Sequence, residues 1–117
     1  MCIRDSFPTL RPEPPYPHPT AEWVGNYLTV REVRTMMVPG DCTDGFAGCY
    51  WSRPERYLDA EVQGGMSILA NMDPMDLRVG SERLAHAVRS GEWDDRHGHL
   101  RSLDEFDAGY RLVVCEW

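Results

Sequence analysis

Branched and apolar side chains are concentrated in two distant stretches of this chain. Residues 31–38 are β-prone, and the Pro39-Gly40 pair that follows predicts a turn. Residues 110–115 have the same character and predict a second strand. A lone pair of strands is marginal in water. We therefore expect further strands upstream of this chain.

Between and before these strands, apolar residues recur at helical spacing. Each of the three predicted helices follows a polar N-cap residue: Thr20, Asp59 and Asp73. The third helix starts at Pro74 and stops at Gly91. One face of it carries Leu77, Leu84 and Val88. Amphipathic helices of this kind must bury that face against another element.

Three further segments are not assigned to helices or strands. Residues 91–107 are interpreted as a polar connection whose apolar anchors are Trp93, Leu100, Leu103 and Phe106. Residues 7–19 hold six of the nine prolines and form a linker. Residues 1–6, MCIRDS, match a translated sequencing adaptor, so we exclude them from the fold and expect the native protein to extend upstream.

Composition narrows the function classes. The formal charge of -7 repels a phosphate backbone and argues against nucleic acid as a partner. All 12 basic residues are arginine, which excludes lysine chemistry. No run is long and apolar enough to cross a membrane, and the 4 cysteines form no C-x-x-C pair. We expect a cytoplasmic protein with free thiols.

The densest chemistry lies in the stretch 41–59, DCTDGFAGCYWSRPERYLD. It combines carboxylates, two cysteines, four aromatic rings and two arginines. A helix that starts at residues 43–46, capped by Asp41 or Asp44, would place Phe46 and Tyr50 on one face. The density of polar and aromatic groups indicates a site.

This stretch also carries a family resemblance. The runs CTDGFAGCYWSRPERYLDAEV, SERLAHAVRSGEWDDRHGHL and LDEFDAGYRLVV, within residues 41–114, resemble the C-terminal part of class I S-adenosylmethionine-dependent methyltransferases. The chain has Ala60 where the pattern has proline. It also lacks a G-x-G-x-x-G turn, so the resemblance implies that the cofactor-binding half is missing.

The resemblance implies an α/β fold. Residues 20–117 would be a truncated C-terminal portion of a Rossmann-like methyltransferase domain. Residues 31–38 and 110–115 would be its last, antiparallel strands, with residues 41–107 inserted between them as a substrate lid. S-adenosylmethionine would be the cofactor of the full-length parent and a small molecule its substrate. This fragment alone is expected to bind no cofactor and to be inactive.

Methyl transfer requires an enzyme to position the acceptor and remove its proton. The predicted substrate-binding residues are Asp41, Phe46, Tyr50, Trp51, Arg53 and Tyr57. Asp41 follows the first strand, where a ligand crevice would open. The aromatic rings line a pocket or belong to the core. Arg53 and Arg56 clamp a substrate carboxylate or pair with nearby aspartates.

Two histidines complete the candidate chemistry. His97 and His99 have side chains suited to general-base catalysis near neutrality, and a structural role is the alternative. Together with Cys42 and Cys49 they offer metal-binding atoms, but the spacing fits no recognised metal motif and no metal is predicted. The rival hypothesis for the whole chain is a small, non-enzymatic interaction protein with a Pro-rich arm.

Overall fold

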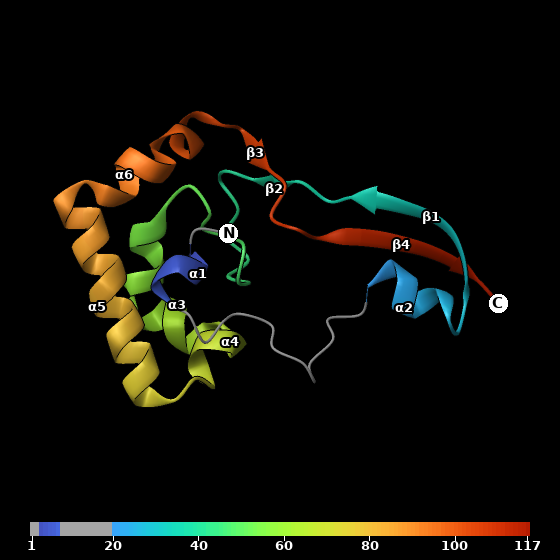
Figure 1. The fold of residues 1–117 in the computed structure, drawn as a ribbon, viewed down its shortest axis with the longest axis horizontal. Helices are drawn as coiled ribbons and strands as arrows, with labels where there is room; N and C mark the ends of the chain where they lie inside the picture. Colours follow the sequence, from blue (N-terminus) through green and yellow to red (C-terminus); the bar gives the residue numbers. More distant parts are fainter. Residues whose placement is uncertain (1–2, 8–19) are drawn as a thin grey trace.

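The computed structural model describes residues 3–7 and 20–117 of the chain. A helical body and a two-stranded ribbon lie side by side in an elongated molecule of 50 × 33 × 23 Å (Figure 1). The predicted linker falls almost wholly on residues 8–19, outside the described residues. Among the helices described, none is long and apolar enough to cross a membrane.

The ribbon consists of β1 (Thr29–Thr35) and β4 (Arg111–Glu116), which pair antiparallel. Their register places Val33 opposite Val113, with an irregularity between Val30 and Glu32. The antiparallel pairing of the two predicted strands is thereby confirmed. The first strand, however, begins and ends earlier than predicted.

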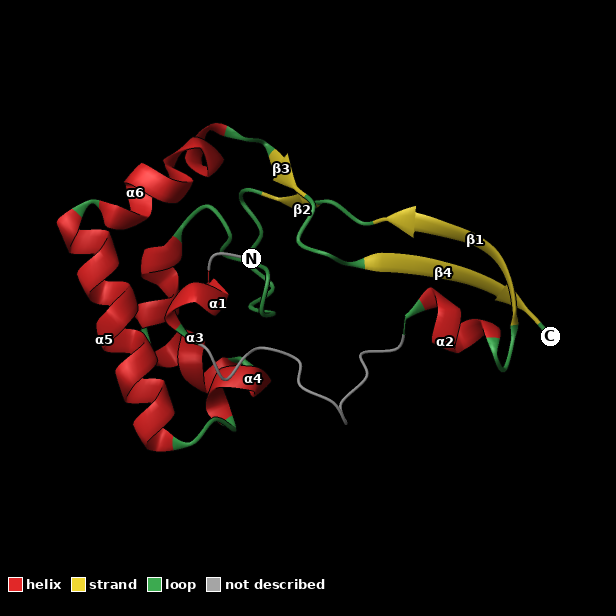
Figure 2. Cartoon of the chain, viewed as in Figure 1, coloured by secondary structure: helices red, strands yellow, loops and turns green. Residues whose placement is uncertain are grey.

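A second, short sheet explains that difference. Residues 31–38 do not form one strand, because the chain leaves β4 after Met36 and pairs again as β2 (Val38–Pro39) with β3 (Glu105–Phe106). Pro39 lies at the end of β2, and the predicted turn follows directly: Gly40 and Asp41 are turn residues, and the Cys42 N–H donates to the Pro39 carbonyl at 3.2 Å. This second pairing joins the ribbon to the helical body (Figure 2).

Helix α2 (Ala21–Gly25) precedes the ribbon and contacts β1. As predicted, the hydroxyl of Thr20 caps it by accepting from the backbone N–H of Trp23 at 3.1 Å. The ribbon and α2 leave large apolar side chains exposed: Trp23, Tyr27, Val33, Leu112, Val114 and Trp117. Exposed apolar surface of this kind is typical of a contact site.

The body contains η2 (Pro54–Leu58), α3 (Ala60–Gly65), α4 (Ser67–Ala70), α5 (Pro74–Ser90), α6 (Glu92–His97) and η3 (Gly98–Ser102). The predicted caps are confirmed: Asp59 accepts from Glu61 N–H at 2.9 Å and Asp73 from Met75 N–H at 2.8 Å. Helix α5 stops at Gly91, as predicted. The polar connection interpreted over residues 91–107 is more regular than expected, because α6, η3 and β3 (Glu105–Phe106) lie within it.

The core of the body has two parts. The larger part packs the helices around Tyr50, Tyr57, Leu69, Leu84 and Trp93. The smaller part joins Val38, Trp51 and Leu100 beneath β2 and β3. Trp93 and Leu100 are buried as expected, whereas Leu103 is 44% exposed and is no anchor.

A short helix at the start of the chain, α1 (Ile3–Ser6), packs against α5. Ile3 and Phe7 are buried in the larger core. The contact depends on Gly80, because a Cβ there would lie 2.1 Å from the Phe7 ring. The adaptor origin of residues 1–6 stays a prediction.

Candidate functional site

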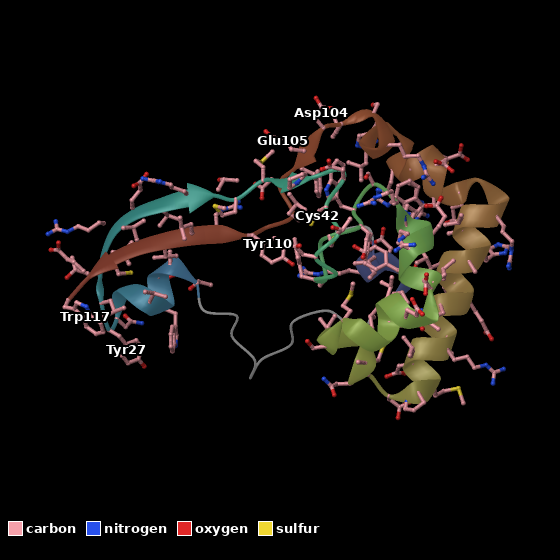
Figure 3. All side chains as sticks on the ribbon, turned by 180° about the vertical axis from the view of Figure 1, so that it is seen from behind. Tyr27, Cys42, Asp104, Glu105, Tyr110 and Trp117 are labelled. Carbon is pink, nitrogen blue, oxygen red and sulfur yellow. The ribbon has the colours of Figure 1, made fainter. Side chains whose placement is uncertain are left out.

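The candidate site is a groove at the junction of ribbon and body. It has a volume of about 510 Å³ and is called the junction groove below. Its lining residues are Met36, Met37, Val38, Pro39, Asp41, Cys42, Thr43, Asp44, Phe46 and Tyr110. Figure 3 shows Cys42 and Tyr110 at this junction. The volume lies within the range of small-molecule sites.

Irregular backbone builds the wall of the groove. Residues 41–53 form bends and turns, so the predicted helix starting at residues 43–46 is absent and neither Asp41 nor Asp44 caps one. Tyr110, just before β4, holds this wall by accepting from the Gly48 N–H at 3.2 Å. A Cβ on Gly48 would lie 2.8 Å from the Tyr110 ring. Glycine is thus required for this close approach.

The aromatic residues of the central stretch divide into two groups. Phe46 is half-buried, lines the groove and meets Tyr110 edge to face at 5.2 Å. Tyr50, Trp51 and Tyr57 are buried in the core and do not line the groove.

Hydrogen bonds of the indole and phenol groups to the backbone fix two of these buried rings. Trp51 donates to the Val38 carbonyl at 3.0 Å, and Tyr57 donates to the Ala47 carbonyl at 2.8 Å. The structure therefore gives them a packing role. A substrate contact by any of the three buried rings stays a prediction.

Two carboxylates mark the rim of the groove. Asp41 and Asp44 are both exposed and both line it. Within residues 3–7 and 20–117, neither side chain has an ion pair or a hydrogen bond. Their negative charge is therefore available to a ligand.

Arg53 faces a second groove, of about 620 Å³, which Asp41 also lines. Its guanidinium donates to the Cys42 carbonyl and stacks on the Tyr50 ring, 5.2 Å from the centroid. The predicted pairing with an aspartate applies instead to Arg56, which lies 3.8 Å from Asp59. The Nε atom of Arg53 is buried and has no hydrogen-bond partner among the residues that the structure describes. A substrate role for Arg53 stays a prediction.

The second groove is held by Arg101, which residue-by-residue reading missed. Its guanidinium bridges Glu55 at 2.5 Å and Asp94 at 2.7 Å, and it stacks on the Trp93 ring. The hydrogen bonds that Arg101 donates to these carboxylates, that to Glu55 first, raise the pKa of Arg101. This cluster fastens η2, α6 and η3 together.

Neither candidate histidine lines either groove. His97 lies 3.1 Å from the Asp5 carboxylate and packs against Trp93. His99 is exposed on η3. Neither imidazole therefore contacts the junction groove, where a methyl-acceptor molecule would bind. Their catalytic role stays a prediction.

The thiols lie apart from the histidines. Cys42 lines the junction groove. The thiol of the buried Cys49 lies within hydrogen-bond reach of the Cys42 thiol. Burial raises the pKa of the Cys49 thiol, and Cys42 adds to that rise. Cys42, Cys49 and Cys115 are free, whereas Cys2 lies outside the described residues. In the described part of the chain, no three metal-binding side chains form a cluster.

The described residues do not fit S-adenosylmethionine in the usual way. Such cofactors lie on a glycine-rich turn between a strand and a helix. Gly40 follows β2, but an irregular loop comes after it, and Gly45 and Gly48 lie within that loop.

Sequence reasoning found Asp41 and Phe46 but missed Met36, Met37 and Tyr110. The two methionines look like part of one strand, and their exposure follows from the break between β1 and β2. Tyr110 comes from the far end of the chain. The signal that could have identified it is Gly48, a small residue that leaves room for a ring.

Comparison with known proteins adds one likeness. No protein-family model and no curated protein matches the chain. A solved structure described as a "Putative methyltransferase from antibiotic biosynthesis pathway" of Anabaena variabilis matches with a TM-score of 0.77 and 31% identity. The match covers 98% of this chain and 48% of that one. It supports a methyltransferase fold of the mixed α/β class.

Proposed function

We propose that this chain is the acceptor-side portion of an S-adenosylmethionine-dependent small-molecule methyltransferase. The ribbon would supply the last two strands of the sheet, and the helical body would cover the acceptor in the junction groove. The observation that carries the proposal is the structural likeness over 98% of the chain. The cofactor-binding half would be a separate upstream segment of the parent protein.

The exposed surface of the ribbon supports the proposal that a further part of the protein packs against it. The side chains of its two strands are poorly buried, and Val33, Leu112 and Val114 are exposed to solvent. Two strands alone are marginal in water. A further strand paired with β4 would extend the sheet, and helices packed on its two faces would cover these side chains, since Val33 and Leu112 lie on opposite faces of the ribbon. The chain also spans only about half of the solved protein that it resembles.

Within this proposal, the residues of the junction groove hold and orient the acceptor. The cofactor would supply the electrophilic methyl group when bound, so the groove has to place an acceptor atom in line with it. Phe46 and Tyr110 offer ring surface, and Asp41 and Asp44 offer carboxylates.

The test is methyl transfer by a longer polypeptide that continues upstream of Phe7. Phe46→Leu should lower the rate of transfer at least several-fold and leave the affinity for S-adenosylmethionine unchanged, because Phe46 belongs to the acceptor wall and its adjoining core and not to the proposed cofactor half. The matched control is Leu103→Ala, an exposed residue on the second groove. Equal rates for the Phe46→Leu variant and the parent would contradict an acceptor role for the groove.

A second candidate is a non-enzymatic interaction protein, and the exposed ribbon favours it too, because such a face fits a protein partner. The genomic reading frame separates the two. An upstream frame that encodes a strand and a glycine-rich turn supports the enzyme. A frame that stops before Phe7 supports the interaction protein.

A further inference from the structure

We propose that the junction groove selects acceptors that join an apolar ring system to a protonated amine. The inference rests on the proposed function, since it names the acceptor class of that same site. It is carried by the charge and the side-chain chemistry of the lining residues.

The charge of the lining residues favours a cationic ligand. The charged side chains among the lining residues are Asp41 and Asp44, both acidic and both without ion pairs in the described part of the chain. The guanidinium groups of Arg53 and Arg111 contact backbone carbonyls of this lining. Arg53 donates to the Cys42 carbonyl, and its side chain opens onto the second groove. Arg111 donates to the Tyr110 carbonyl at 2.9 Å while paired with Asp107. In the described part of the chain neither guanidinium pairs with Asp41 or Asp44, so an ammonium group at the rim would meet two carboxylates that no arginine neutralises. The net charge of -7 also attracts cations.

The apolar side chains of the lining favour a ligand with a ring system. Phe46 and Tyr110 pair edge to face, and both rings border the groove. Aromatic rings attract cations and pack against apolar ring systems. Met36 and Met37, partly exposed, add flexible apolar surface that adapts to a ligand's shape.

The volume of the junction groove limits the size of the ligand. The volume of about 510 Å³ is suited to a small, drug-sized molecule. A bicyclic aromatic ring with a short aminoalkyl arm is of that order. Such a molecule could place its ring between Met36 and Phe46 and its ammonium near the aspartates.

The experiment compares three probes of one shape: naphthylethylamine, naphthylethanol and naphthylacetate. Each is titrated into the folded chain, with binding followed by calorimetry and by shifts of the backbone amide resonances. We expect the amine to bind about tenfold more tightly than the alcohol, and the acetate to bind least. Added salt should weaken binding of the amine and leave the alcohol unchanged.

Two sets of variants assign the effect to the groove. Asp41→Asn combined with Asp44→Asn should reduce the affinity for the amine to that for the alcohol. The charge-matched control, Glu61→Gln with Asp95→Asn, removes the same charge outside the groove and should change little. Phe46→Leu should weaken binding of the amine several-fold, because it removes aromatic ring surface from the groove.

Each outcome decides the proposal. Equal binding of amine and acetate would overturn it, as would amine binding that the double aspartate variant leaves unchanged. Failure of all three probes to bind a chain whose amide spectrum shows it folded would also overturn it. Selective amine binding without methyl transfer by the longer polypeptide would contradict the proposed function and leave the amine selectivity standing.

Discussion

The helical body and the ribbon differ in how they are held together. In the body, Trp51 and Leu84 are fully buried, and capped helices pack around them. In α2 and the ribbon, Trp23 and Leu112 are about 44–45% exposed, and among the described elements α2 packs on β1. The body has the packing of an independent unit, whereas the ribbon has the surface of an interface. This difference is what the proposed upstream half would explain.

The largest expected effect is in the body. Trp51→Ala removes a fully buried ring and two hydrogen bonds of its indole N–H. We expect a loss of about 3–5 kcal/mol in the free energy of unfolding, measured by urea denaturation. The matched control in the other region is Trp23→Ala, which should cost well under half as much. Equal losses would contradict the contrast between the regions.

The next effect concerns the dense packing of α1 on α5. Gly80→Ala places a Cβ into the Phe7 ring, so it should cost about 1–3 kcal/mol or release α1 from the body. Gly64→Ala is the control, because a Cβ there meets nothing within 4 Å. It should leave the stability equal or raise it by about 0.5–1 kcal/mol. Thermal melts and hydrogen exchange of α1 distinguish the two outcomes of Gly80→Ala, and a melt unchanged from the parent would refute the packing.

A smaller effect depends on pH. Burial raises the pKa of Cys49 above its ordinary 9.0, so the folded thiol keeps its proton where the unfolded thiol has lost it. The unfolded state then binds fewer protons, and the free energy of unfolding falls as the pH rises above about 9. Urea denaturation from about pH 7 to about pH 10 measures this fall.

The control for that measurement is a second thiol. Cys49→Ala should remove the part of the fall that Cys49 causes, whereas Cys115→Ala, on the ribbon, should keep it. In the folded chain, iodoacetamide should also modify Cys49 much more slowly than Cys42, because buried thiols react poorly. A Cys49 that reacts as fast as Cys42 would show that the wall of the groove opens readily.

Local signals in the sequence predicted the helix boundaries well. Thr20, Asp59 and Asp73 cap helices in the structure because a cap depends on residues within one turn. Helix α6 was missed since it is short and polar, with Trp93 as its buried residue. Tertiary contacts hold it in place: α6 packs on α5, and Arg101 binds Asp94 within it.

The candidate site was harder to predict. Phe46 and Asp41 were identified from their neighbourhood in the chain, but Tyr110 lies 62 residues after Gly48, which it contacts. The same stretch that supplies the groove also supplies Trp51 and Tyr57 to the core. Burial depends on the fold, so one dense motif could not be divided into wall and core from its composition.

Titration of S-adenosylmethionine by calorimetry tests the central claim most directly. The account predicts no binding heat with residues 7–117 alone and clear saturable binding with the polypeptide extended upstream. Leu112→Thr should weaken that binding in the longer polypeptide while leaving the melt of the chain alone almost unchanged, because its side chain lies at the proposed interface. Saturable binding of S-adenosylmethionine by residues 7–117 alone would contradict the account.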